Sequence, residues 1–339
     1  MERRVPVAAE ARRGHGWRWL ACGIVIGGLA AWLVFARTDM AGVKALLLDD
    51  LHYGALAGAL LAYAAFFVGK ALRWRYLLRP LIEVPLSRLI AFVLIGYGGN
   101  VLLPMQAGEV ARGYLISRHH GIKLAAALSG IAVEKVMDFV VLLAFLAGAL
   151  WFVAVPAPLA REIAVLLAAV LSLVLLTLLA ALVRPEATQA VVQRAAARSS
   201  LPLAGRLAAL LCDGLKGVAA LRHRGLLLKI LVTSLLSWSA MLAALWLVLL
   251  SVAAGPSTVG PSMVGAIIVL FLSAVGLALP TSPGFVGTLQ VAFVVGLVPL
   301  GVAQEVAVAA SLVYQVLTTL LPLAAAGIAW AWLRNRAAR

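Results

Sequence analysis

The sequence predicts an all-α, polytopic membrane protein with about six full spans and two broken re-entrant hairpins in an inverted-repeat arrangement. Three observations predict this fold. Of the 339 residues, 64% are hydrophobic and only 12% are charged, and the mean hydropathy is +1.06. Apolar runs long enough to cross a hydrocarbon core, which takes roughly 20 residues, recur along the whole chain. A short motif containing Pro and Gly occurs twice within the apolar regions.

The longest apolar runs are the expected full spans. The first follows a basic segment and is expected to be an uncleaved anchor, because it is long for the apolar part of a signal peptide. The six expected spans are 19–36, 51–69, 124–155, 163–183, 226–253 and 305–333. Two further apolar regions, 86–117 and 262–303, are interrupted by Pro and Gly and are the expected hairpins.

The basic residues predict the orientation of the chain. The net charge is +15, but Lys and Arg form short clusters between the apolar runs, a pattern typical of membrane topology and headgroup attraction rather than nucleic-acid binding. The positive-inside rule places both termini on the cytoplasmic side of the inner membrane. The expected parts are a basic N-terminus 1–18, a membrane half 19–183, a cytoplasmic amphipathic segment 184–225, a membrane half 226–333 and a basic tail 334–339.

The two interrupted regions share a motif. Leu103–Gly108 and Leu279–Gly284 both read L-P-x-x-x-G. The basic clusters place both ends of 86–117 in the cytoplasm, whereas 262–303 opens to the outside. Broken helices in two units of opposite orientation are typical of secondary transporters, and they mark the binding site.

The first motif contains groups that can expose backbone inside the membrane. Pro104 cannot donate a backbone hydrogen bond and Gly108 permits unusual dihedrals, so we expect the helix to break here. Amide groups at a helix start favour an anion such as a lipid phosphate. Asn100 either caps the broken end or contacts a headgroup.

Glu109 and Arg112 follow the break. Their i, i+3 spacing allows them to pair on one helix face. Such a pair either neutralises itself for structural reasons or takes part in function, which is the usual reason for ionisable groups at this depth.

A second acidic pair, Glu134 and Asp138, lies in an apolar run. Carboxylates at i, i+4 share a helix face and repel unless a cation or a proton lies between them. Arg73, Arg75 or Arg112 is the expected partner. Arg73 and Arg75 have two interpretations, as snorkelling anchors or as contacts to an anionic headgroup.

The second motif has no ionisable residue and offers only backbone and hydroxyl groups. Its candidate residues are Pro280, Pro283, Gly284 and Gly287. No metal-ligand set and no phosphate-binding loop is present in the sequence, so we expect no metal, no cofactor and no direct use of ATP.

The sequence resembles the transmembrane region of lysylphosphatidylglycerol synthases and the related flippase-like membrane proteins, over about 51–333. The motifs that carry the resemblance are Leu72-Arg73-Trp74, Asn100-x-x-x-Pro104-x-x-x-Gly108-Glu109-x-x-Arg112, Glu134-x-x-x-Asp138 and Pro280-x-x-Pro283-Gly284-x-x-Gly287. Gln106, Lys135 and Gln290 depart from the family pattern, where a basic residue, an Arg and an acid are usual. These departures affect the expected substrate more than the fold.

The resemblance implies a lipid transporter that is not an enzyme and that moves a phospholipid or a polyprenyl-linked lipid between leaflets. A separate lipid-modifying enzyme and a second copy of the chain are the protein partners considered. Two alternatives stay open: a membrane-embedded polyprenyl-phosphate phosphatase, and a non-transporting partner of a lipid-modifying enzyme or a glycosyltransferase.

Overall fold

The computed structural model describes residues 13–103, 106–150, 185–198, 224–252, 262–278 and 282–337, together with positions 205, 208 and 212. Helices and short connections make up these segments, and none of the described residues lies in a strand. The expected span 163–183 and the two candidate residues Pro104 and Pro280 lie outside the described residues.

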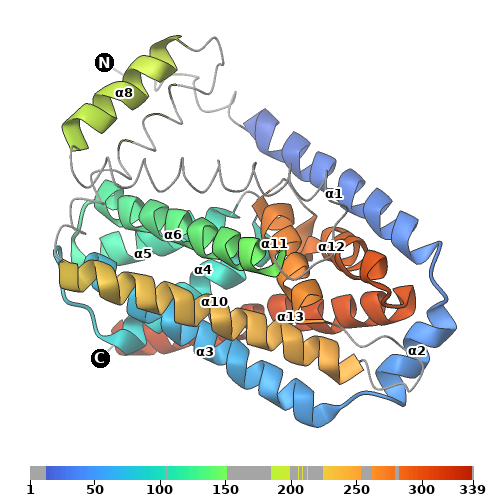
Figure 1. Cartoon of the computed structure of the whole chain (residues 1–339). Helices are drawn as coiled ribbons and strands as arrows, with labels where there is room; N and C mark the ends of the chain where they lie inside the picture. Colours follow the sequence, from blue (N-terminus) through green and yellow to red (C-terminus); the bar gives the residue numbers. More distant parts are fainter. Residues whose placement is uncertain are drawn as a thin grey trace, which may run out of the picture.

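The described helices follow the expected order along the chain (Figure 1). They are α1 (Arg13–Phe35), α2 (Met40–Leu48), α3 (Tyr53–Leu78), α4 (Leu86–Leu102), α5 (Ala107–His120), α6 (Leu124–Leu150), α8 (Pro185–Arg198), α10 (Arg224–Val252), α11 (Met263–Ala278), η4 (Pro283–Phe285), α12 (Thr288–Leu297), η5 (Val298–Leu300) and α13 (Gln304–Ala337).

Length and apolarity identify four membrane-crossing candidates in the described part of the chain, or five if α1 and α2 form one span bent by 90°. The four are Tyr53–Leu78, Gly225–Val252, Pro283–Leu300 and Gln304–Arg336. Helix α6 has sufficient length, 27 residues, but carries three ionisable residues in its middle. The protein is therefore a multi-pass helical membrane protein, and the count of six full spans stays a prediction.

Helices α4 and α5 form an antiparallel pair across the first motif. The Phe92 ring lies 5.6 Å from the His119 ring at the open end. At the other end Gly99 faces Gly108, where an added Cβ on Gly99 would lie 3.0 Å from the Gly108 Cα. Helix α5 ends at His120, and the next residue, Gly121, has left-handed backbone (φ 69°) and donates a hydrogen bond from its N–H to the carbonyl oxygen of Ser117, which closes the last turn.

The sequence predicted that Gly108 supplies unusual backbone dihedrals at the break. This prediction is wrong, because Gly108 lies within helix α5. The left-handed residue is Gln106, with φ 53°. Gly108 is required by close packing instead: a Cβ there would collide with the Gly96 carbonyl and would lie 2.7 Å from Asn100 Oδ1.

Helices α11 and α12 form the second antiparallel pair. Gly276 faces Thr288 near the break, and Gly296 faces Val269 toward the other end. The turn between the helices uses left-handed backbone at Gly284 (φ 69°) and Gly287 (φ 83°). A Cβ at Gly287 would collide with the backbone of α1, so this glycine also permits a close helix contact.

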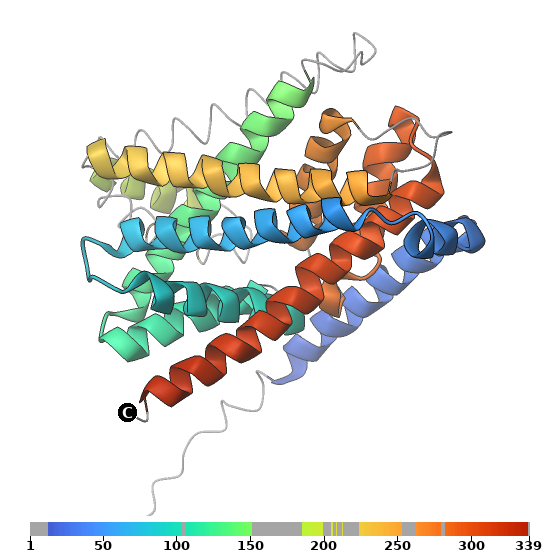
Figure 2. The ribbon, with the colours of Figure 1, turned by 90° about the horizontal axis from the view of Figure 1, so that it is seen from below.

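Long helices surround the two pairs. Helices α3 and α10 run side by side along their length (Figures 1 and 2), and a Cβ at Gly69 of α3 would collide with Ser237 of α10. Helix α13 crosses them obliquely (Figure 2) and packs along α4, where Gly98 lies against the Pro322 carbonyl. Small residues at such contacts let helices approach closely, which is a main source of helix association in membranes.

We predict that Gly108→Ala lowers the free energy of unfolding by about 1–3 kcal/mol, because the added methyl group has no space between α4 and α5. The matched control is Gly130→Ala in α6, where a Cβ would meet no atom within 4 Å. Thermal unfolding of the detergent-solubilised protein measures both. A Gly108→Ala variant as stable as Gly130→Ala would contradict the close packing of the first hairpin.

Candidate functional site

Seven ionisable side chains gather where α3, α5 and α6 meet. Each helix contributes a pair of residues three or four positions apart, which places the pair on one face of that helix, and α6 adds Lys135 directly after Glu134. They are Lys70 and Arg73 on α3, Glu109 and Arg112 on α5, and Glu134, Lys135 and Asp138 on α6.

Glu134 lies at the centre of this cluster. Its side chain is fully buried, and its carboxylate contacts three cations from two other helices. Oε1 lies 2.9 Å from Arg73 Nη2 and 3.3 Å from Lys70 Nζ, while Oε2 accepts a hydrogen bond of 3.0 Å from Arg112 Nη2. This one carboxylate therefore connects all three helices.

Asp138 lies one turn further along α6 and contacts the same α3 cations. Its carboxylate lies 2.5 Å from Lys70 Nζ and 2.7 Å from Arg73 Nη1. Trp238 of α10 donates a hydrogen bond of 2.6 Å from Nε1 to Oδ1. The two acids that would repel each other at i, i+4 are thus separated by two shared cations.

Glu109 occupies the other side of the cluster. Its carboxylate lies 2.6 Å from Arg112 Nη2, as the i, i+3 spacing predicts, and 2.8 Å from Lys135 Nζ. The Lys135 side chain is 40% exposed, whereas its partner is almost fully buried. Lys135 is therefore the accessible cation of the cluster.

The cluster carries more positive than negative charge. Four cations face three carboxylates, so one positive charge has no counterpart among the seven residues. Arg112 is fully buried, lies against the Trp74 ring at 4.5 Å, and has no hydrogen-bond partner for Nε and Nη1. An additional anion would balance the charge.

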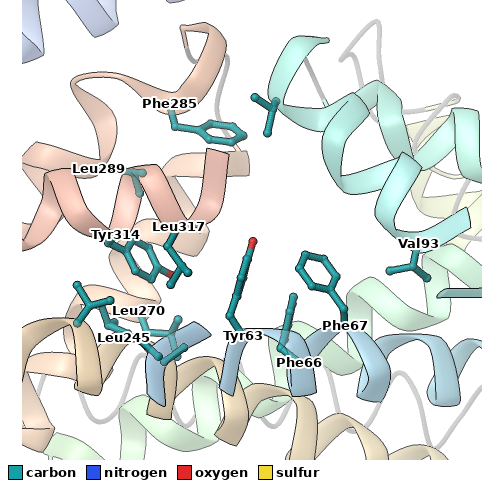
Figure 3. Packing of buried hydrophobic residues seen from close by; sticks show 14 of the residues in the cluster. Tyr63, Phe66, Phe67, Val93, Leu245, Leu270, Phe285, Leu289, Tyr314 and Leu317 are labelled. Atoms are coloured by element: carbon teal, nitrogen blue, oxygen red, sulfur yellow. The ribbon is translucent and has the colours of Figure 1, made fainter. Parts of the chain in front are cut away.

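A cavity of about 440 Å³ borders the cluster. Its charged and amide lining residues are Asn100, Gln106, Glu109, Lys135 and Asp138. Most of the remaining wall is aromatic or aliphatic: Tyr63 and Phe66 extend from α3, and Phe285 points toward the same space from the second hairpin (Figure 3). The cavity is thus mostly apolar, with a few charged and amide side chains from the cluster and the first hairpin.

The two hairpin tips meet at this cavity. Gln106 Nε2 donates a hydrogen bond of 3.2 Å to the carbonyl oxygen of Leu277, and both residues line the cavity wall. Asn100 lies nearby with a buried Oδ1 that has no hydrogen-bond partner. Asn100 therefore does not cap the start of α5 through this oxygen, and its contact with a headgroup stays a prediction.

The second motif has a different local role. The Gly284 carbonyl accepts a hydrogen bond of 2.9 Å from Gln315 Nε2, and the Gly287 amide donates one of 2.7 Å to Gln290 Oε1. Gln290 in turn donates to Gln315 at 2.6 Å. These bonds occupy the Gly284 carbonyl and the Gly287 amide of the turn, and Pro283 begins the short helix η4. A transport role for these residues stays a prediction.

The structure brings together most of the expected site residues. Arg73 and Arg112 are the partners of Glu134, as expected, but Arg75 is exposed and makes no ion pair with the cluster. Sequence reasoning missed Lys70 and Lys135 as members of the site. The signal was present in the sequence: Lys70 precedes Arg73 by one helical turn inside an apolar run.

The carboxylates of the cluster are paired with basic side chains rather than grouped with one another. No group of three or more His, Cys, Asp or Glu side chains in the described segments is arranged to hold a metal ion. Lysine and arginine occupy the positions between the carboxylates, so a divalent cation would meet positive charge there.

Fold and site together define a multi-pass helical membrane protein with a buried ionic cluster beside an apolar cavity. The chain belongs to the family described as the lysylphosphatidylglycerol synthase TM region, whose model matches residues 20–326. It is therefore a membrane protein related to lipid chemistry.

A partial similarity connects the chain to a second protein. It is 27% identical over 130 residues to the glycosyltransferase AglD of Haloferax volcanii. The match covers 38% of this chain and 20% of AglD, so the matched part spans about a fifth of that relative.

We predict that Glu134→Gln lowers the free energy of unfolding by about 3–5 kcal/mol, because the neutral amide leaves three buried cations without their shared anion. Thermal unfolding monitored by size-exclusion chromatography measures the effect. The control is Asp50→Asn, an exposed carboxylate outside the cluster, which should change stability by less than about 0.5 kcal/mol. Equal stability of the two variants would mean that the cluster does not hold the helices together.

Proposed function

We propose that the protein moves a phosphate-bearing lipid between the two leaflets of the inner membrane. Both termini lie in the cytoplasm in this proposal, and the two hairpins are re-entrant parts of an inverted repeat. The observation that carries the proposal is the mostly apolar cavity that borders the buried ionic cluster and has the accessible ammonium group of Lys135 in its wall, which matches the two chemical parts of an anionic lipid.

The charge of the cluster supports a phosphate as the polar ligand. One positive charge lacks a counterpart, and Lys135 presents a partly exposed ammonium group at the cavity wall. A lipid phosphate there would accept hydrogen bonds from Lys135 and Gln106 and would balance the cluster. A phospholipid such as phosphatidylglycerol and a polyprenyl phosphate-linked lipid share this chemistry.

The position of the hairpin tips supports transport. Broken helices whose tips meet beside a binding cavity allow a site to open alternately to each side of the membrane. The hydrogen bond from Gln106 to Leu277 joins the two hairpins beside the cavity, and a passing headgroup would replace it. Tails of the lipid would stay among the apolar side chains of the wall and the surrounding bilayer.

The phosphatase alternative is less well supported. A phosphatase needs an acid, a base and a phosphate-binding cation near the reacting group, whereas the second hairpin region 262–303 contains no ionisable residue. The carboxylates of the first hairpin are already paired with buried cations. We therefore propose a transporter that leaves its lipid chemically unchanged.

A second candidate function is a membrane partner of a lipid-modifying enzyme. Its specific support is the similarity to AglD, a protein described as a glycosyltransferase. Co-purification of such an enzyme with the chain, together with an absence of lipid movement by the chain alone, would favour this candidate over the transporter.

The test of transport uses the purified full chain in vesicles that contain a fluorescent phosphatidylglycerol. We predict that the protein moves this lipid across the bilayer and that Lys135→Gln slows the movement about tenfold or more, since a hydrogen bond to a charged group contributes about 1.5–3 kcal/mol. Lys135→Arg keeps the charge and should retain most of the rate.

The matched control is Lys44→Gln, which removes an exposed cation outside the cavity. Gel filtration and thermal unfolding establish that each variant is folded, and mass spectrometry of the recovered lipid establishes that it is unchanged. Unaltered movement in folded Lys135→Gln, or release of phosphate from a polyprenyl diphosphate by the unmodified protein, would contradict the proposal.

A further inference from the structure

A second, smaller pocket lies where α3 and α10 end together. Its volume is about 270 Å³. Arg75 lies in the last turn of α3, and Arg79 is the residue that follows this helix. Lys229 lies in the first turns of α10. Glu83 is the one carboxylate of the lining, so the pocket has an excess of positive charge.

This pocket is separate from the buried cluster. Arg73 and Arg75 are two positions apart on α3, which turns their side chains to different faces of the helix. Arg73 is fully buried against Glu134 and Asp138, whereas Arg75 is exposed. One ligand cannot bridge the two places without passing through helix α3.

The surroundings of the pocket favour a lipid over a soluble anion. Both α3 and α10 are membrane-crossing candidates, so their common end lies at the level of the lipid headgroups. Leu81 and Leu228 each precede a lining residue in the sequence and have exposed fractions of 53% and 62%. The Tyr76 ring lies 5.8 Å from Lys229 Nζ, and a tyrosine at this depth is typical of the membrane interface.

We propose that this pocket, formed by Arg75, Tyr76, Arg79, Ile82, Glu83 and Lys229, is a binding site for the phosphate of an anionic phospholipid in the adjacent leaflet. The guanidinium and ammonium groups hold the phosphate, and the exposed leucines contact the first part of the acyl chains. The site does not depend on transport through the central cavity.

Native mass spectrometry of the full-length, detergent-solubilised protein tests the proposal, with phosphatidylglycerol as the probe. We predict that the double variant Arg79→Gln/Lys229→Gln binds one phosphatidylglycerol about tenfold or more weakly. Each basic residue near an anionic lipid surface raises the binding affinity roughly fivefold. The matched control is Arg88→Gln with Arg334→Gln, which removes the same charge from exposed positions outside the pocket.

Equal phosphatidylglycerol binding by the two double variants would overturn the proposal. Binding of inorganic phosphate in place of phosphatidylglycerol, lost in the Arg79/Lys229 variant, would overturn the assignment to a lipid. Lipid movement across vesicles is measured on the same preparations, because it reports on the central cavity rather than on this pocket. The Arg79/Lys229 variant should lose the bound lipid even if the unmodified protein moves no lipid.

Discussion

The contact of Glu134 with three buried cations is the interaction on which the rest of the structure depends. Lys70, Arg73 and Arg112 reach this carboxylate from α3 and α5, while the acid itself belongs to α6. An unpaired charge in a hydrocarbon environment is expensive, so none of these helices can leave the others without exposing one. The cluster therefore holds the first hairpin against a membrane-crossing candidate helix.

This arrangement also determines which groups are available to a ligand. The deeply buried charges pair mainly with one another, and the accessible cation is Lys135, at the edge of the cluster and in the cavity wall. Aromatic rings of α3 and α4 pack edge to face behind it, with Phe67 and Tyr97 at 5.1 Å. A rigid aromatic wall and a single accessible charge favour recognition of a headgroup rather than of a large polar molecule.

Sequence reasoning predicted the helical class, the two broken regions and the pairing of Glu109 with Arg112, because each depends on local spacing or on composition. It predicted the wrong role for Gly108, since close approach between α4 and α5 is a tertiary feature that no local pattern contains. Arg75 and Arg73 look equivalent in sequence and lie on different faces in space. The contact between Gln106 and Leu277 joins residues 171 positions apart, and no periodicity could have indicated it.

The departures from the family pattern have structural explanations that the sequence did not supply. Gln106 bonds the opposite hairpin tip, where a basic residue would bring a further charge. Gln290 accepts a hydrogen bond from the Gly287 amide and donates one to Gln315. An ionised acid at this position could accept the first bond but has no N–H group with which to donate the second. With uncharged amides at both places, the charged residues of the cavity wall are those of the central cluster.

The central claim is that lipid passes between the two hairpin tips, and a reversible cross-link tests it most directly. Gln106→Cys and Leu277→Cys would be combined in a protein whose Cys22 and Cys212 are replaced by Ser, joined by a short thiol-reactive cross-linker that contains a reducible disulfide, and reconstituted with fluorescent phosphatidylglycerol. The account predicts that the linked protein moves no lipid and that reduction restores the movement. Undiminished movement in the linked protein would contradict it.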